Sequence, residues 1–358
     1  MRIDLADVPA LERGVSLLGS GGGGDTVTAA ALLRRWLADA AGGAVRLTAA
    51  RDLPPGTRVV PLGLVGATAV FTEKLPGGGE FRAAVAAIER WTGERADALM
   101  SIEVGGLNGV LPLAAAADLR LSYVDADLSG RGLPRLDQLS VAAAGRGLAP
   151  VALAEPGGQV LVLADGTPAE IERTVRSFLT GSGGWAVLAL APILAGDLPG
   201  CSVLGTTSGA LDLGRRVLAA GESPGADRLA AATGGRVLTL GRVLEVAHRM
   251  GPGEHGRPGF GRGSVTVTDH ATRSLLRLEM ENEYLLALRD GEVVASTPDV
   301  LAVLDRRTCV PISTEVLRHG TEVAVLQLPA AGFWTDPRHA PALRPRAYGI
   351  DSDPVLLR

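Results

Sequence analysis

Two aspartates one residue apart are strong candidates for chemistry in this sequence. Asp125 and Asp127 follow the apolar segment 121–124, and in an extended backbone alternate side chains point to the same side. Two carboxylates held close together repel, so they need a cation, hydrogen-bond donors or a shared proton. The pair therefore predicts either a divalent metal site or acid–base chemistry. Arg131 is another source of counter-charge, and a solvated turn is the alternative without chemistry.

A third carboxylate ends another short apolar segment. Glu103 follows residues 99–102 and precedes Gly105, Gly106 and Asn108. Strand ends are where α/β proteins place ligands, and paired glycines permit close approach of a ligand. We predict that Glu103 is catalytic and that Asn108 binds substrate. A surface ion pair for Glu103 and a helix cap formed by Asn108 remain the alternatives.

Four consecutive glycines form a loop that favours an anionic ligand. The apolar residues 14–18 before it predict a strand, and the spacing of Ala29, Leu33 and Leu37 predicts a helix after it. Backbone N–H groups and a helix start both attract phosphate or carboxylate, whereas a tightly packed turn without a ligand is the alternative. The predicted binding residues of the loop are Ser20, Gly21, Gly22, Gly23, Gly24 and Asp25.

Lys74 is the single lysine among 35 lysines and arginines. A buried lysine can lose its proton and act as a base or as a compact anion anchor, which arginine cannot readily do. We therefore include Lys74 among the catalytic candidates. Its chance retention beside Glu73 is the alternative.

These candidates need elements to position them, and the sequence predicts two kinds. Helical spacing at 81–91 and strand-like segments at 99–103 and 119–123 indicate an α/β domain. A helix should begin at Thr167-Pro168, and after about residue 235 the apolar residues alternate, with Asp290-Gly291 as a hairpin turn. We predict an N-terminal α/β domain over residues 1–166 and a strand-rich α+β domain over residues 167–358.

Composition excludes several classes of protein. Hydrophobic residues make up 46% of the 358 residues, which is enough for a buried core. A formal net charge of −4 offers no basic field for nucleic acid. The longest uncharged stretch, residues 177–196, is interrupted by glycines and a proline and is too short in its apolar part to span a membrane. The first ten residues carry Asp4 and Asp7 and show neither a basic lead region nor a small-residue cleavage site, so we expect a cytoplasmic protein.

Together these motifs resemble the family named after S-methyl thiohydantoin desulfurase. In the N-terminal half, the resemblance rests on residues 18–25, Glu73-Lys74, Glu103 to Asn108 with Pro112, Val124 to Arg131 with Pro134, and Gly205-Thr206 with Ser208. In the C-terminal half, it rests on residues 261–263, Asn282-Glu283, Pro298-Asp299, Leu317-Arg318 with Gly320, and residues 345–349.

The resemblance implies a cytoplasmic enzyme that hydrolyses five-membered cyclic amide or thioamide rings and occurs with hydantoinase-type subunits. One segment departs from the family pattern. Where the family usually has methionine, and further on glutamate after an aromatic residue and proline, this chain has Leu128-Ser129 and Arg135. This departure inverts a charge beside the expected site.

We therefore predict a hydrolase-like enzyme acting on a cyclic amide, thioamide or S-alkyl isothiourea ring. Water attacks the ring carbon, with Asp127 or Asp125 and Glu103 as acid–base groups and Arg131 or Lys74 as anion anchor. Asp127→Asn is then expected to abolish turnover and spare the fold. The partners expected are a small-molecule substrate and a homo-oligomer or hydantoinase-type subunit. The alternatives are a binding or regulatory subunit and a nucleotide- and Mg²⁺-dependent enzyme.

Overall fold

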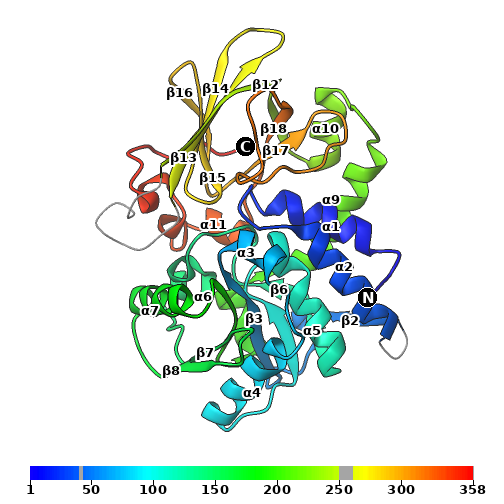
Figure 1. The fold of residues 1–358 in the computed structure, drawn as a ribbon, viewed down its shortest axis with the longest axis vertical. Helices are drawn as coiled ribbons and strands as arrows, with labels where there is room; N and C mark the ends of the chain where they lie inside the picture. The colour runs from blue at the N-terminus through cyan, green and yellow to red at the C-terminus, as the bar shows by residue number, and fades with distance from the viewer. Residues whose placement is uncertain (40–42, 250–260, 358) are drawn as a thin grey trace.

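Two β-sheets with their helices make up the protein. The computed structural model describes residues 1–39, 43–249 and 261–357. Figure 1 shows the C-terminal sheet above the N-terminal one, with α1 (Val8–Leu18), α2 (Thr26–Asp39) and α9 (Thr206–Ala219) along one side. The predicted fold class is confirmed, because an N-terminal α/β part is followed by a strand-rich part.

The first sheet is nine-stranded and mixed. Its order is β1 (Arg2–Asp4), β2 (Ala44–Thr48), β5 (Ser122–Val124), β4 (Ala98–Ser101), β3 (Arg58–Gly66), β9 (Trp185–Leu190), β7 (Val151–Ala154) and β8 (Val160–Leu163), while β10 (Ile193–Leu194) also pairs with β3. β2, β5, β4 and β3 are parallel neighbours, so their carboxyl ends share one edge. Ligand sites of α/β sheets lie at such an edge.

This sheet continues beyond the predicted domain boundary at residue 166. β9 lies between β3 and β7, and α7 (Pro168–Gly181) connects β8 to β9. Thr167 and Glu170 form a capping box at the start of α7, which confirms the helix expected at Thr167-Pro168. The predicted division into domains stays a prediction, but residues 167–194 are structurally part of the first sheet.

The second sheet is seven-stranded and antiparallel. Its order is β16 (Glu292–Ser296), β15 (Tyr284–Arg289), β14 (Leu275–Met280), β13 (Arg262–Asp269), β12 (Arg236–Arg249), β18 (Glu322–Leu328) and β17 (Val300–Asp305). Positive φ angles at Asp290 and Gly291 form the tight turn between β15 and β16. The expected hairpin is thus confirmed.

The segment before the glycine loop is a helix, so the predicted strand at residues 14–18 is wrong. Residues 14–18 lie in α1, where Leu11 and Val15 are fully buried one turn apart. A short apolar segment fits a strand or a buried helix equally well, and Pro9 near the helix start was the missed signal. Likewise Leu119 ends α5 (Leu111–Leu119), and only residues 122–124 form a strand.

The remaining α-helices are short except for α4. They are α3 (Thr68–Glu73), α4 (Glu80–Thr92), α6 (Ser140–Ala143), α8 (Leu198–Cys201), α10 (Ala226–Thr233) and α11 (Gly332–Thr335), and β6 (Ala126–Asp127) pairs with β11 (Val203–Leu204) as a separate ribbon. Among the described helices, none is long and apolar enough to cross a lipid bilayer.

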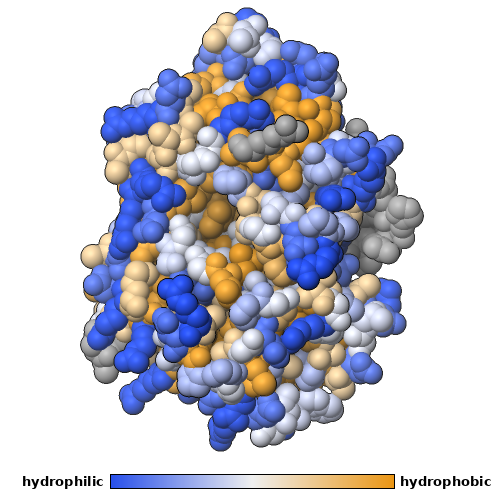
Figure 2. Space-filling view, turned by 180° about the vertical axis from the view of Figure 1, so that it is seen from behind, coloured by the Kyte–Doolittle hydropathy of each residue, from blue (hydrophilic) through white to orange (hydrophobic). Residues whose placement is uncertain are grey.

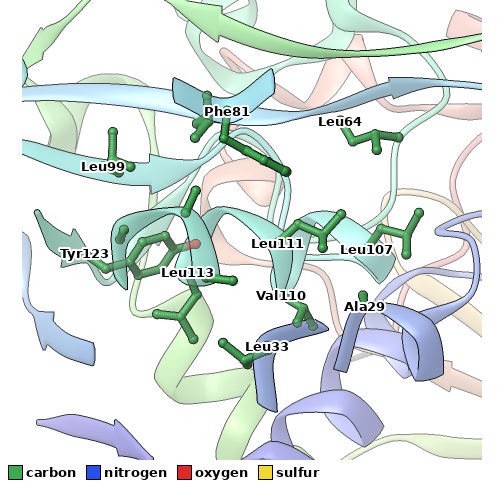
Figure 3. Close-up of a cluster of buried hydrophobic side chains, with 14 of the residues drawn as sticks. Ala29, Leu33, Leu64, Phe81, Leu99, Leu107, Val110, Leu111, Leu113 and Tyr123 are labelled. Atoms are coloured by element: carbon green, nitrogen blue, oxygen red, sulfur yellow. The ribbon is translucent and has the colours of Figure 1, made fainter. Parts of the chain in front are cut away.

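An apolar core fixes the first sheet against α2 and α5. Figure 3 shows Leu33 of α2, Leu111 and Leu113 of α5, and Leu99 and Tyr123 of the sheet drawn together in one cluster. All five side chains are fully buried. Burial of one large apolar side chain contributes about 1.5–3 kcal/mol, so this cluster holds the strand ends in place.

Two glycines let α1 and α9 cross at backbone distance. A Cβ atom on Gly14 would lie 1.8 Å from the carbonyl oxygen of Ala210, and one on Gly214 would lie 1.7 Å from that of Ala10. Neither oxygen can move away without bending its helix. The crossing joins the start of the chain to the segment that leads into the second sheet.

We expect Gly214→Ala to destabilise the protein by about 3 kcal/mol, since the added methyl group overpacks a backbone contact. Gly209 lies in the same helix with no atom near its Cβ position, so Gly209→Ala should stabilise by about 0.5–1 kcal/mol. Urea unfolding of the two variants measures both effects. Equal stability of the variants would contradict the close crossing.

Candidate active site

The carboxyl ends of β3 and β4 meet at one pocket. Leu64, Val65 and Gly66 end β3, while Glu103 and Asn108 follow β4, and all of them line the pocket. Parallel neighbours bring these segments to the same edge of the sheet. Glu103 and Asn108 therefore lie at the end of a strand, while their predicted catalytic and binding roles stay predictions.

The second half of the chain supplies the opposite wall of the pocket. Asn282 and Glu283 precede β15, and they lie against Gly22 of the glycine loop. The pocket contains about 580 Å³ of empty space, including its open mouth. Figure 2 shows a recess near the middle of the molecule on the face that it presents. The site is thus assembled from both halves of the chain.

Glu103, which is half-buried, and Glu283, which is buried, both line this pocket with their carboxyl groups. Burial and the charge of Glu283 raise the pKa of Glu103 well above its usual value, although the backbone N–H of Leu133 donates to its Oε2 atom at 2.9 Å. Burial also raises the pKa of Glu283 to about 7. Because two carboxylates so placed cannot both ionise easily, the pair favours holding one proton.

One oxygen of Glu283 is left without a partner. Its Oε1 atom accepts a hydrogen bond from the side chain of Asn282 at 2.8 Å. Its Oε2 atom is buried and has no hydrogen-bond partner within residues 1–39, 43–249 and 261–357. A buried polar atom without a partner is costly, which marks Oε2 as an atom that a ligand or a water can satisfy.

Asn108 holds the pocket wall and does not cap a helix. It accepts a hydrogen bond from the N–H of Leu64 at 2.6 Å and donates to the carbonyl of Leu64 at 2.9 Å. The helix after it begins at Leu111 without a side-chain cap. The capping alternative is therefore wrong, and the amide of Asn108 joins the ends of β3 and β4.

Two arginines line the third wall, but both have acidic partners. Arg135 lies 3.2 Å from Asp137 and 3.6 Å from Glu281. Arg176 lies 2.7 Å from Glu172 and donates to the carbonyl of Pro134. The charge that Arg135 introduces beside the site is consequently balanced by neighbouring carboxylates.

The glycine loop packs by its backbone against the residues after β4. The N–H of Leu107 donates to the carbonyl of Gly23 at 2.8 Å, and a Cβ atom on Gly23 would lie 2.4 Å from the Cα of Gly106. Gly22 and Gly23 line the pocket, whereas Gly21, Gly24 and Asp25 line a separate cavity on the other side of the loop. Both predicted uses of the loop, packing and access to a ligand site, are thus compatible with the geometry.

The two aspartates face different groups and do not line the pocket. Asp125 accepts bonds from the N–H groups of Thr207 and Ser208, at 3.0 Å each, and from the hydroxyl of Ser208 at the start of α9. Asp127 accepts bonds from Val104, Gly130 and the hydroxyl of Ser129. Their carboxylates anchor backbone segments, so the proposed catalytic use of this pair gains no support from their placement.

The remaining candidates also lie outside the pocket. Arg131 is buried and donates to the carbonyls of Pro298 and Asp299 and to the hydroxyl of Ser20. Lys74 lies 3.6 Å from Glu155 with its side chain 37% exposed. Asp25 directly precedes α2 and accepts a hydrogen bond from the N–H of Val27. Of the predicted site residues, Glu103, Asn108, Gly22 and Gly23 are brought together.

The aspartates do not fit a metal ion. Hydrogen-bond donors, which a cation would repel, surround both carboxylates. In the part of the chain that the structure describes, no three His, Cys, Asp or Glu side chains are grouped to hold a metal. We derive no step through a metal.

Glu283 and Asn282 were missed as functional residues. They lie in the polar segment 281–283 between the apolar strands β14 and β15. Two glutamates between apolar strands are an unusual pattern, and the sequence alone could have identified them as candidates. Their contact with the glycine loop, about 260 residues earlier in the chain, could not be predicted from the sequence.

Fold and pocket define a two-sheet α/β protein with a carboxyl-lined pocket between its halves. The chain belongs to the S-Me-THD-like family, whose N-terminal and C-terminal domain models match residues 6–165 and 166–356. The family name refers to S-methyl thiohydantoin desulfurase and implies an enzyme. The suspected resemblance is therefore confirmed.

A crystal structure of a protein from Chromobacterium violaceum is similar to this chain. The two share 23% sequence identity at a TM-score of 0.78, and the match covers 99% of this chain and 100% of the other. At this identity the likeness shows a common fold. No curated protein matches the chain.

Replacement of Asp127 tests its role as an anchor. In Asp127→Asn, the side-chain NH₂ group replaces a carboxylate oxygen, so a donor faces a backbone N–H donor and one hydrogen bond is lost. We therefore expect the free energy of unfolding to fall by about 2–3 kcal/mol. Asp118 forms an exposed ion pair with Arg82, and Asp118→Asn should cost less than about 1 kcal/mol. Denaturant unfolding compares the variants. If Asp127→Asn keeps its stability but loses turnover, Asp127 is catalytic and is not merely an anchor.

The raised pKa of Glu283 makes stability depend on pH. The folded protein binds this proton more tightly than the unfolded chain, whose ordinary pKa is 4.5. The resulting stabilisation is complete below that value and is lost as the pH rises through about 7. We expect Glu283→Gln to reduce the loss of stability between about pH 5 and about pH 8. The same pH dependence in both proteins would contradict a raised pKa.

Proposed function

We propose that this chain hydrolyses a five-membered cyclic amide, thioamide or S-alkyl isothiourea, with Glu103 and Glu283 as the acid–base pair. The observation that carries the proposal is the buried Oε2 atom of Glu283, which has no partner within the described residues and lines a pocket shared with Glu103. Membership of the S-Me-THD-like family supports the substrate class.

The pair is suited to acid–base work because one proton can be shared between its members. Each carboxyl group disfavours ionisation of the other, and burial disfavours ionisation of both. Near neutral pH one member is then a carboxylate and the other a carboxylic acid. Two carboxyl groups in different protonation states provide a base and an acid in one pocket.

The reaction proceeds by attack of water on the ring carbon between the two nitrogens. The ionised carboxylate takes a proton from water as the new C–O bond forms, and the protonated carboxyl group gives its proton to the leaving atom. With an S-alkyl substituent, the C–S bond breaks and a thiol leaves. The remaining hydroxyl proton moves to the ring nitrogen as the ring carbon becomes a carbonyl, so water and substrate yield a cyclic urea and a thiol.

The rest of the pocket suits a small flat ring. Leu64, Ile102, Leu107 and Leu136 provide apolar surface, and the Asn108 amide fixes the position of this wall. Asp127 binds the N–H of Val104, next to Glu103 in the chain. We assign Asp127 a positioning role and leave catalysis to the two glutamates.

Turnover of S-methyl thiohydantoin tests the assignment. Glu103→Gln and Glu283→Gln should each lower kcat by about 10²- to 10⁴-fold, because each removes one acid–base group. The matched control is Glu80→Gln, since Glu80 is also buried but binds the N–H groups of Gly77 and Gly78 away from the pocket. This control should retain turnover.

The pH dependence of kcat/KM adds a second measurement. We expect a bell-shaped profile in the wild type, since only the singly protonated pair is active, and loss of one limb in each glutamine variant. Unchanged turnover in either variant contradicts the acid–base pair. A wild-type protein that binds hydantoin without turnover favours the alternative of a binding or regulatory subunit.

A further inference from the structure

Tyr348 carries a buried hydroxyl group that the proposed reaction does not use. The residue ends the 3₁₀ turn Pro345–Tyr348 and packs with Leu285, Trp334 and Leu343 in an apolar cluster. Its side chain is 2% exposed, and its hydroxyl has no hydrogen-bond partner in the part of the chain that the structure describes. A donor buried this way calls for an acceptor.

Charged groups of the pocket wall surround this tyrosine. The guanidinium carbon of Arg135, which lines the pocket, lies 5.5 Å from the centre of the Tyr348 ring. The same guanidinium lies 3.6 Å from Glu281, two residues before Glu283. The charges acting on the phenol are those of Arg131, Glu283, Arg135 and Glu281. Tyr348 therefore lies beside Arg135, a residue of the pocket wall, and shares an apolar cluster with Leu285, two residues after Glu283.

Glu283 has an unpaired acceptor atom that matches the unpaired donor of Tyr348. Its Oε2 atom is a buried acceptor without a donor, as described above. Besides burial, the charges of Arg131 and Glu281 act on Glu283, and the charge of Glu283 acts in turn on Glu103. Tyr348 and Glu283 thus each leave one buried polar atom unsatisfied, a donor and an acceptor, and a buried water is the usual link between two such atoms.

We propose that Tyr348 is a positioning residue for Glu283: its hydroxyl donates a hydrogen bond, through one enclosed water, to the Oε2 atom. This bond holds the carboxyl group in one orientation towards the pocket and favours its ionised form. The inference rests on the proposed function for its catalytic meaning, but the contact itself is measurable without turnover.

Tyr284 provides a matched control. It is also a fully buried tyrosine with an unpartnered hydroxyl. Burial alone raises its pKa, and no charge of the pocket acts on it. Tyr284→Phe therefore removes the same buried hydroxyl group as Tyr348→Phe does, but from a position that does not act on Glu283.

The titration of Glu283 tests the contact directly. In protein labelled with ¹³C at glutamate carboxyl carbons, the Glu283 signal is identified by its loss in Glu283→Gln. We expect Tyr348→Phe to raise its titration midpoint by about one pH unit, because a donor to the carboxylate is lost. Tyr284→Phe should leave the midpoint unchanged. An unchanged midpoint in Tyr348→Phe, or an equal shift in both variants, overturns the proposal.

Kinetics separate this inference from the proposed function. With S-methyl thiohydantoin as substrate, Tyr348→Phe should lower kcat by about tenfold and leave KM unchanged. The acidic limb of the pH–rate profile should shift to higher pH. A midpoint shift without any wild-type turnover supports the contact and contradicts the proposed function. If Tyr348→Phe does not fold, a crystal structure of the wild type decides. A water within hydrogen-bond distance of both atoms supports the proposal, and its absence there overturns it.

Discussion

Backbone packing between glycine segments holds the candidate active site together. The N–H of Gly132 donates to the carbonyl of Leu18, and Gly23 lies against Gly106 so closely that no side chain fits at either position. Three segments far apart in sequence thereby meet at van der Waals distance beside the strand ends. Each of these contacts excludes a Cβ atom, so the high glycine content at these positions follows from geometry.

The two halves of the chain contribute one carboxyl group each to the pocket. Glu103 follows a strand of the first sheet, whereas Glu283 precedes a strand of the second. The N–H of Tyr284 donates to the carbonyl of Ser20, which docks the second sheet on the glycine loop. Because proton sharing depends on the separation of the two groups, the protonation of the pair is tied to the docking of the halves.

Local sequence patterns predicted the class of the fold and part of the site. Glycine runs and the short apolar segment before Glu103 pointed to the correct edge of the sheet. The same reasoning placed chemistry at Asp125 and Asp127, which stays a prediction. It did not foresee that their carboxylates lie outside the pocket and bind hydrogen-bond donors from residues as distant as Thr207. The role of Glu283 depends on a contact across some 260 positions, which no periodicity encodes.

The third wall of the pocket differs from the other two in its construction. Residues 133–136 lie outside the strands of both sheets and are held by Arg176 and by backbone contacts to Glu103 and Glu172. The N–H of Leu133 donates to Glu103, so this wall also contacts one of the two glutamates. The reversed charge at position 135 therefore lies on a loop, where it alters the surface presented to a ligand without belonging to a strand of either sheet.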